Sequence, residues 1–245
     1  KLIKKKPKKI VAVTGTDGKW SVADFYYQIL NLNKKETASI GTIGVQLKNK
    51  KNFAENTTLD PIRLREVINY LVKKKIKNII LEASSHGLKQ NRLDGLLFDI
   101  GIFTNLSHDH LDYHKNFKDY LNSKLYLFNN LIKKKGTIIT DPTIPQFKKF
   151  KSLVKKKNLR LLSILNSNAD LELVSHKYDN NHQILTIREK NKKKIIKLNL
   201  DLIGKIQIKN VLMAILAATK SGLNINSIAK SIIKLKPAEG RLEKI

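Results

Sequence analysis

A glycine-rich turn carrying a lysine lies between a strand-like and a helix-like segment. Residues 14–21 read Thr-Gly-Thr-Asp-Gly-Lys-Trp-Ser. In such a turn, glycines let backbone N–H groups close around a phosphate, the helix N-terminus adds positive potential, and Lys19 supplies a charge. The spacing departs from the GxxxxGK[ST] pattern because position 13 is valine. An ordinary loop is therefore the alternative, but the strand before and the helix after favour a nucleotide site.

Lys124 falls on the apolar side of a helix-like segment. That side is formed by Phe117, Tyr120, Leu121, Leu125 and Phe128. A lysine facing a core is costly unless it snorkels to solvent, is paired, or is chemically altered. Snorkelling is the simplest interpretation of the pattern, and chemical alteration is the alternative with functional consequences.

Imidazole and carboxylate side chains are concentrated in residues 107–114, which read Ser-His-Asp-His-Leu-Asp-Tyr-His. Glu82 ends another strand-like run. Ligand sites in doubly wound sheets lie beyond the carboxyl ends of the strands, so these groups could converge with Lys19. Carboxylate, imidazole and hydroxyl ligands together suit Mg²⁺ or Mn²⁺ beside a phosphate better than zinc. Capping and turn roles for the His/Asp run are the alternative.

These residues need elements to position them, and the hydrophobic pattern supplies an alternation of strands and helices. Apolar residues at helical spacing from Val22 to Leu30 predict one helix. The other predicted helices are 61–75, 116–132 and about 146–156, and the predicted strands are 9–15, 37–45, 78–83, 98–104, 136–140 and 159–164. Such alternation is typical of an α/β fold with a mainly parallel, doubly wound sheet.

The pattern changes near residue 170. Residues 171–176, 183–189 and 194–200 predict short antiparallel strands, with a hairpin turn at 179–181. Two helices follow, one carrying Ile208 to Leu216 in register and one over about 226–234. We expect a single domain over residues 1–245. It would comprise a parallel α/β core at about 1–168, antiparallel strands at about 169–203, closing helices at 204–236, and the start of a linker at 237–245.

The chain is strongly basic, with 48 Lys and Arg against 20 Asp and Glu and a formal net charge of +28. Only six of the basic residues are arginine. Direct readout of nucleic-acid bases favours arginine, so this composition argues against a nucleic-acid site. Lysine runs at 73–75, 133–135 and 155–157 each lie at the end of a predicted helix, where cations complement the helix dipole. A solvated basic surface is therefore favoured over a nucleic-acid site. No apolar stretch is long enough for a membrane span. The lack of cysteine excludes disulfides and fits the cytoplasm.

Longer motifs lie at residues 55–58, 82–92, 98–106, 109–114 and 240–243. They resemble the central domain of the Mur ligase family, in the branch that adds the third amino acid of the peptidoglycan stem. The SSHGL and DHLDYH runs within them are specific to this branch. The resemblance extends over nearly the whole chain.

The resemblance implies ATP-driven amide-bond formation on UDP-N-acetylmuramoyl-L-alanyl-D-glutamate through an acyl phosphate, with Mg²⁺ as cofactor. The incoming diamino acid would be meso-diaminopimelate or, as the alternative, L-lysine. Lys19, Lys124, His110 and Arg241 would be catalytic, and Lys124 would be carbamylated by CO₂. The residues implied to hold ATP are Gly15, Thr16, Asp17, Gly18, Lys19, Trp20, Ser21 and Asn210. Those implied to hold substrate are Asn56, Thr57, Thr58, Ser84, Gln90 and Arg92, and the implied metal ligands are Ser21, Glu82, His110 and Lys124.

Two departures from the family pattern lie in the glycine-rich turn. Asp17 stands where the family has asparagine, and Trp20 replaces the first of two hydroxyl residues, while Ser21 keeps the second. A catalytically degenerate nucleotide- or substrate-binding module is therefore the alternative function. The resemblance also implies that the N-terminal UDP-binding and C-terminal amino-acid domains are absent here. We therefore expect the isolated chain to be inactive, monomeric and cytoplasmic, without nucleic-acid or membrane partners.

Overall fold

The computed structural model describes residues 7–47, 50–52, 56–109, 112–179, 182–190, 195–202 and 204–237. Within them the strands are hydrogen-bonded in the order β11-β10-β9-β8-β7-β6-β1-β5-β2-β3-β4. Their bounds are β1 Lys9–Thr14, β2 Thr37–Gly41, β3 Gly44–Leu47, β4 Lys50–Asn52, β5 Asn78–Glu82, β6 Phe98–Phe103, β7 Ile132–Thr140, β8 Arg160–Leu165, β9 Leu171–Asp179, β10 His182–Glu189 and β11 Ile195–Leu200.

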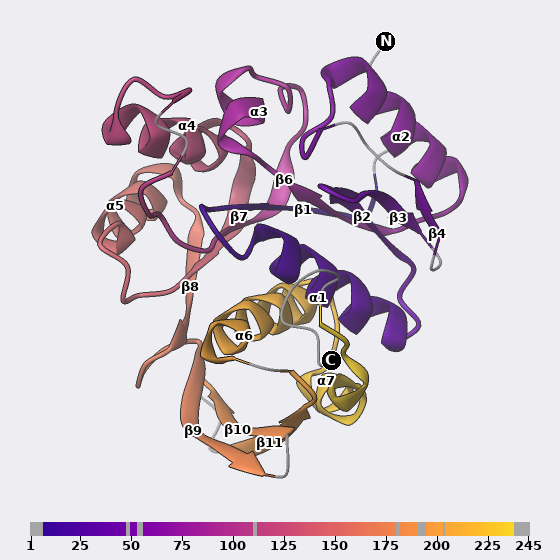
Figure 1. Ribbon diagram of the computed structural model, residues 1–245, viewed down its shortest axis with the longest axis vertical. Coiled ribbons are helices and arrows are strands. Elements are labelled where there is room, and N and C mark those ends of the chain that lie inside the picture. Colours follow the sequence, from indigo (N-terminus) through magenta and orange to yellow (C-terminus); the bar gives the residue numbers. More distant parts are fainter. Residues whose placement is uncertain are drawn as a thin grey trace.

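The middle of the sheet is parallel and covered on both faces. Strands β2, β5, β1, β6, β7 and β8 pair in parallel. Because side chains alternate along a strand, Ile10 and Ala12 of β1 enter one core and Val11 and Val13 the other. Helices α2 (Pro61–Lys73), α4 (Phe117–Asn130) and α5 (Phe147–Lys157) cover one face, and α1 (Lys19–Leu32) and α6 (Lys205–Lys220) the other (Figure 1). The predicted doubly wound α/β sheet is confirmed.

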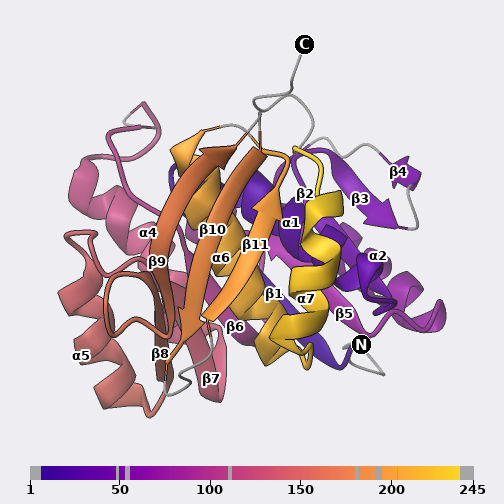
Figure 2. The same cartoon turned by 90° about the horizontal axis from the view of Figure 1, so that it is seen from below.

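The antiparallel part consists of β9, β10 and β11. It joins the parallel part through two residue pairs between β8 and β9. Leu185, Leu198 and Leu200 point into the same core as α6 and α7 (Ile225–Ser231), which continues as a 3₁₀ turn over Ile232–Lys234. Figure 2 shows the three strands side by side, with α6 behind them. The predicted antiparallel strands are confirmed, while two residues of the predicted hairpin turn, 180 and 181, lie outside the described residues.

Helix starts follow local capping signals, with one informative exception. The Asp60 side chain accepts from the amides of Ile62 and Arg63 at the start of α2, where proline occupies the first turn. Asn116 caps α4 in the same way. Helix α1 instead begins after Gly18, which has a φ of 79° and supplies no side-chain cap. The N-terminus of α1 therefore has no capping side chain to compete with a ligand.

The predicted strand 37–45 is wrong in its extent. It is two antiparallel strands, β2 and β3, which pair from Ala38↔Leu47 to Gly41↔Gly44. The chain reverses at Thr42 and Ile43, and Gly44 takes a φ of 93°, which glycine adopts without strain. The apolar run continued across this reversal, so periodicity alone could not reveal it.

The predicted helix 116–132 extends too far, and one lysine run was misplaced with it. Helix α4 ends at Asn130, and residues 133–135 belong to strand β7. Lys133 therefore does not complement a helix dipole, and its Nζ pairs with the Asp99 carboxylate at 2.9 Å. The runs after α2 and at the end of α5 do lie where predicted.

The short helix α3 (Ser85–Lys89) and strand β4 were not predicted. Helix α3 begins where the Ser84 hydroxyl accepts from the Gly87 amide at 3.0 Å, a local capping arrangement too short to give a hydrophobic period. In the part of the chain that the structure describes, no helix combines the length and apolar character required to cross a membrane.

Candidate active site

The glycine-rich turn connects the end of β1 to the start of α1 at the carboxyl edge of the sheet. Lys19 folds back over this turn, and its Nζ donates to the carbonyl oxygens of Gly15 at 3.1 Å and Thr16 at 2.7 Å. The Lys19 cation therefore lies at the N-terminus of α1, where the helix dipole also favours an anion. This is the arrangement expected of a phosphate-binding loop.

The turn is held in place by residues that follow β6. The Asn105 side-chain oxygen accepts from the amides of Thr16 at 3.1 Å and Asp17 at 2.8 Å. The Thr104 hydroxyl donates to the Asp17 carbonyl at 2.6 Å. A Cβ on Gly15 would lie 1.8 Å from the Thr104 hydroxyl oxygen, so only glycine permits this approach. The loop is thus fixed by neighbouring side chains before any ligand binds.

Lys124 is buried and does not snorkel, since its relative exposure is 1%. Its Nζ donates to the Gly15 carbonyl at 2.7 Å and lies 4.4 Å from the centre of the Tyr120 ring. The same carbonyl accepts from Lys19, so two amines meet at one oxygen of the loop. The apolar pattern placed Lys124 on the core side correctly, and the structure directs its amine to the phosphate loop.

The surroundings of Lys124 favour a neutral amine. Burial, together with the nearby Lys19 charge, lowers the pKa of Lys124 to about 6, against smaller opposing effects of Asp109 and Asp17. An amine with a pKa near 6 is largely unprotonated at neutral pH. Lys124 can therefore act as a nucleophile without first losing a proton.

Glu82 ends β5 with its carboxylate buried at the same edge. Its Oε1 accepts from the Thr42 amide at 2.8 Å, and its Oε2 from the Thr42 hydroxyl at 3.3 Å. A Cβ on Gly41 would lie 1.9 Å from Oε1, so the glycine at the end of β2 makes room for the carboxylate. The β2–β3 reversal thus fixes the orientation of Glu82.

A second hydrogen-bonded group lies beside Glu82. The buried Thr58 hydroxyl lies 3.0 Å from the Ser84 hydroxyl and also accepts from the Ser84 amide at 2.9 Å. Arg92 donates from Nη1 to the Thr58 carbonyl at 2.8 Å. Residues far apart in sequence are therefore joined next to the carboxyl end of β5.

Asn210 approaches the phosphate loop from α6. A Cβ on Gly18 would lie 2.6 Å from the Asn210 side-chain oxygen, and the Asn210 amide donates to Gln207 at 3.2 Å. Helix α6 begins at Lys205, so Asn210 lies in its second turn. Trp20 lines the cleft nearby, and its buried indole Nε1 has no hydrogen-bond partner among the described residues.

One cleft of about 480 Å³ joins these groups. Gly15 contributes through the carbonyl that Lys19 and Lys124 share. His110 and Arg241 lie outside the described residues. The predicted site residues that line the cleft are Thr16, Asp17, Gly18, Lys19, Trp20, Ser21, Asn56, Thr57, Thr58, Glu82, Ser84, Gln90, Arg92, Lys124 and Asn210.

The sequence interpretation missed Thr42, Ser85, His86 and Ile206 as lining residues and Asn105 as a support of the loop. Thr42 and Asn105 each follow the carboxyl end of a parallel strand, and that rule could have found them. Ile206 comes from α6, which the topology brings across the cleft, and no local signal marked it.

The donor set can be tested against a divalent cation. Within the described residues there is no group of three or more His, Cys, Asp and Glu side chains able to hold a metal. The Glu82 carboxylate and the Ser21 hydroxyl do line the same cleft. Hard oxygen donors of this kind fit Mg²⁺, which usually takes few protein ligands and completes its shell with phosphate oxygens and water.

Comparison with known sequences decides the family. Residues 13–218 match the sequence model of the Mur ligase middle domain. The chain is a member of the Mur ligase family. The matched region contains the phosphate loop, Glu82, Lys124 and Asn210. Of the predicted site residues, Arg241 alone lies outside it.

Curated Mur ligases show high similarity along almost the whole chain. The UDP-N-acetylmuramoyl-L-alanyl-D-glutamate–2,6-diaminopimelate ligase of Rickettsia montanensis is 36% identical over 249 residues, covering 98% of this chain and 50% of the relative. The ligase of the same name from Zymomonas mobilis is 36% identical over 238 residues, covering 97% and 49%. The chain thus spans about half the length of the curated relatives it matches.

Solved Mur ligase structures share the fold. A structure of UDP-N-acetylmuramoyl-L-alanyl-D-glutamate–2,6-diaminopimelate ligase superposes with a TM-score of 0.86 and 26% identity, over 96% of this chain and 48% of that chain. MurF ligase from Thermotoga maritima in complex with ADP gives a TM-score of 0.72 at 16% identity, over 97% and 51%. At that identity the second likeness concerns the fold alone.

Proposed function

We propose that this chain is the ATP-binding central domain of a ligase that joins diaminopimelate to UDP-N-acetylmuramoyl-L-alanyl-D-glutamate. The observation that carries the proposal is the single cleft that unites the phosphate loop, Lys124, Glu82 and the Thr58–Arg92 group. The relatives' names support diaminopimelate over L-lysine as the amine. We further propose that residues 1–245 form one domain and that the protein acts as a monomer in the cytoplasm, where ATP is available.

The proposed reaction has two steps. The side-chain carboxylate of D-glutamate attacks the γ-phosphorus of ATP, ADP leaves, and an acyl phosphate forms. The amine then attacks the acyl carbon, phosphate leaves, and the nitrogen loses a proton. The protein contributes alignment and charge neutralisation. Lys19 would exchange its bonds to the Gly15 and Thr16 carbonyls for bonds to phosphate oxygens.

Glu82, Ser21 and a carbamylated Lys124 are the described residues that would hold Mg²⁺. His110 as a metal ligand and Arg241 as a catalytic residue remain predictions. The cation, when bound, supplies charge neutralisation at the phosphate groups. Thr42 keeps the Glu82 carboxylate oriented through two hydrogen bonds.

Lys124 is the proposed site of a carbamate. The neutral amine attacks the carbon of CO₂, a nitrogen–carbon bond forms, and one proton leaves the nitrogen. The product carries a negative charge, which the nearby Lys19 cation stabilises by attraction. With ¹³C-bicarbonate, we expect a carbamate resonance in the wild-type protein and its loss in Lys124→Met. An identical spectrum for both proteins would exclude the carbamate.

The proposed activity is tested with the complete protein that carries this chain. We expect ADP release that requires UDP-N-acetylmuramoyl-L-alanyl-D-glutamate and diaminopimelate together, and that is lost in Lys124→Met. A control variant, Lys118→Met, changes an exposed lysine on the same helix and should keep the activity. ADP release that is indifferent to either substrate would contradict the proposal.

A degenerate binding module of the same fold is the second candidate. It is favoured by the bulky Trp20, which lines the cleft beside the phosphate loop, and by the acidic Asp17. Such a module would bind nucleotide or the muramoyl substrate without turnover. Saturable binding with no ADP release in the complete protein, under conditions where a relative is active, would favour it over the ligase.

A further inference from the structure

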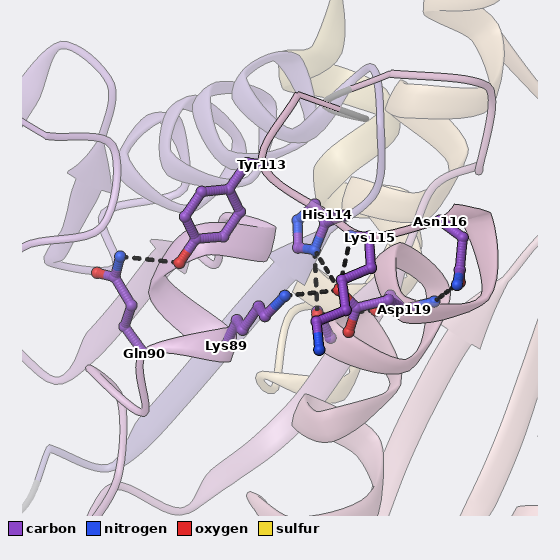
Figure 3. Close-up of polar contacts among 8 residues, drawn as sticks. Lys89, Gln90, Tyr113, His114, Lys115, Asn116 and Asp119 are labelled. Carbon is purple, nitrogen blue, oxygen red and sulfur yellow. Dashed lines mark hydrogen bonds and ion pairs between the residues drawn. The ribbon is translucent and has the colours of Figure 1, made fainter.

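Tyr113 contacts two side chains of helix α3 and a third from the C-cap residue, Gln90. Its ring lies 3.9 Å from the His86 ring, centroid to centroid, and its centroid lies 5.3 Å from the Lys89 Nζ. Its hydroxyl oxygen accepts from the Gln90 Nε2 at 3.0 Å (Figure 3). His86 and Gln90 both line the cleft, whereas Tyr113 lies behind them. Tyr113 therefore contacts the cleft lining without being part of it.

The Gln90 amide is fixed at both ends. While Nε2 donates to Tyr113, the Oε1 atom accepts from the Nε of Arg92 at 2.7 Å. Since the two ends of an amide are chemically different, the tyrosine hydroxyl oxygen keeps Oε1 turned toward the arginine. Arg92 also donates to the Thr58 carbonyl. These two bonds fix the plane of a guanidinium that lines the cleft.

Tyr113 is itself anchored to the start of α4. The neighbouring His114 is 1% exposed and packs against the rings of Tyr113 and Tyr120, both at 5.0 Å. The Asp119 carboxylate accepts from Lys89 at 2.5 Å and lies 3.6 Å from the His114 Nδ1. Figure 3 shows Lys89 and His114 both directed at Asp119. Packing against His114 therefore holds the Tyr113 ring in place while its hydroxyl contacts Gln90.

We propose that Tyr113 is a positioning residue for substrate binding. Through Gln90, its hydroxyl sets the guanidinium plane of Arg92 so that the remaining N–H donors meet an anionic group, carboxylate or phosphate, of the UDP-muramoyl dipeptide. Planar, paired donation is what distinguishes arginine as a binder of such groups. The inference rests on the proposed function, which assigns Arg92 to that substrate.

The test is Tyr113→Phe in the complete protein, because this change removes only the hydroxyl. We expect the KM for the UDP-muramoyl dipeptide to rise about tenfold, the equivalent of one lost hydrogen bond of ~1.4 kcal/mol. The kcat and the KM for ATP should change less than about twofold. The control is Tyr126→Phe, which removes a hydroxyl that donates to Asp94 outside the cleft. It should leave all three constants unchanged.

A double-mutant cycle checks that the effect passes through the amide. Gln90→Leu should raise the same KM on its own and add little to Tyr113→Phe, since both changes break one chain of contacts. If the effects of Gln90→Leu and Tyr113→Phe on this KM are fully additive in free energy, Tyr113 does not act through Gln90.

The Arg92→Gln variant tests the proposed substrate role of Arg92 separately from the positioning role of Tyr113. If Arg92→Gln raises the KM for the dipeptide and Tyr113→Phe does not, Tyr113 has no positioning role while the substrate role of Arg92 stands. If neither variant raises that KM, the proposed role of Arg92 fails and the inference falls with it. A loss of thermal stability in Tyr113→Phe with an unchanged KM would mean a structural role alone.

Discussion

Replacing Lys124 with methionine should stabilise the chain at neutral pH. Methionine has a similar length and no charge, and so it can fill the same buried space on α4. Lys124 is 1% exposed and has a pKa of about 6. In the unfolded chain the same amine has its ordinary pKa of 10.5 and is protonated at pH 7. Folding must therefore remove a proton, and the wild-type protein carries that free-energy cost.

The size of the effect follows from the two pKa values. Deprotonating an amine of pKa 10.5 at pH 7 costs roughly 5 kcal/mol. Losing the hydrogen bond from Nζ to the Gly15 carbonyl offsets about 1–2 kcal/mol of the gain in the variant. We therefore expect Lys124→Met to raise the free energy of unfolding by about 3 kcal/mol at pH 7.

The pH dependence is the sharper part of this prediction. Above the folded pKa of about 6 and below 10.5, the unfolded state binds the extra proton, so wild-type stability rises with pH by roughly 1.4 kcal/mol per unit. The advantage of the variant should shrink by about 3 kcal/mol between pH 7 and pH 9. Urea unfolding followed by circular dichroism, in buffers freed of CO₂, measures it. Lys118→Met, an exposed change on the same helix, should show no such trend.

A difference between wild type and Lys124→Met that stays constant from pH 7 to pH 9 would refute the reasoning. It would mean that the Lys124 amine has the same protonation in the folded and unfolded chains.

Two further predictions concern the phosphate loop. Gly18→Ala should weaken nucleotide binding at least about tenfold, because the new Cβ would lie 2.6 Å from the Asn210 side-chain oxygen. The control is Gly222→Ala, since Gly222 also has a positive φ but has open space around it. This variant should lose stability to backbone strain and keep its nucleotide affinity. Equal affinities for the two variants in calorimetry would contradict the contact with Asn210. Asn105→Ala should lower the free energy of unfolding by about 1–2 kcal/mol, since the amides of Thr16 and Asp17 lose their acceptor. Asn105→Asp keeps an acceptor oxygen and should retain most of that stability in urea unfolding. Equal losses of stability in Asn105→Ala and Asn105→Asp would count against the acceptor role of Asn105.

The parallel core was predictable because its strands are continuous apolar runs separated by helical periods. Asn78–Glu82 is buried along its length, and Phe98–Phe103 is buried at every position except Asp99, as expected of strands covered on both faces. The errors arose where tertiary pairing overrode the local pattern. Ile132 continues the apolar face of α4 in sequence, but it pairs with Phe98 in the sheet. Nothing local distinguishes the two outcomes.

The site was predictable to the extent that its residues follow strand ends. Ser21, Glu82 and Lys124 were assigned by chemistry and resemblance, and the topology brings them into one cleft. What the sequence could not show was the support around them. Thr42 reaches Glu82 only because β2 turns back on itself. Tyr113 reaches Gln90 only because α3 packs beside the start of α4.

The proposed function requires that the cleft bind Mg·ATP through the phosphate loop. Trp20 is the single tryptophan of the chain and lines that cleft, so its fluorescence reports on the site directly. Titration of the chain with Mg·ATP, followed by fluorescence and calorimetry together, should give saturable binding at one site. Lys19→Gln should abolish it, and Lys148→Gln, at an exposed position on α5, should not. The absence of binding by both methods, or equal binding by Lys19→Gln, would contradict the account.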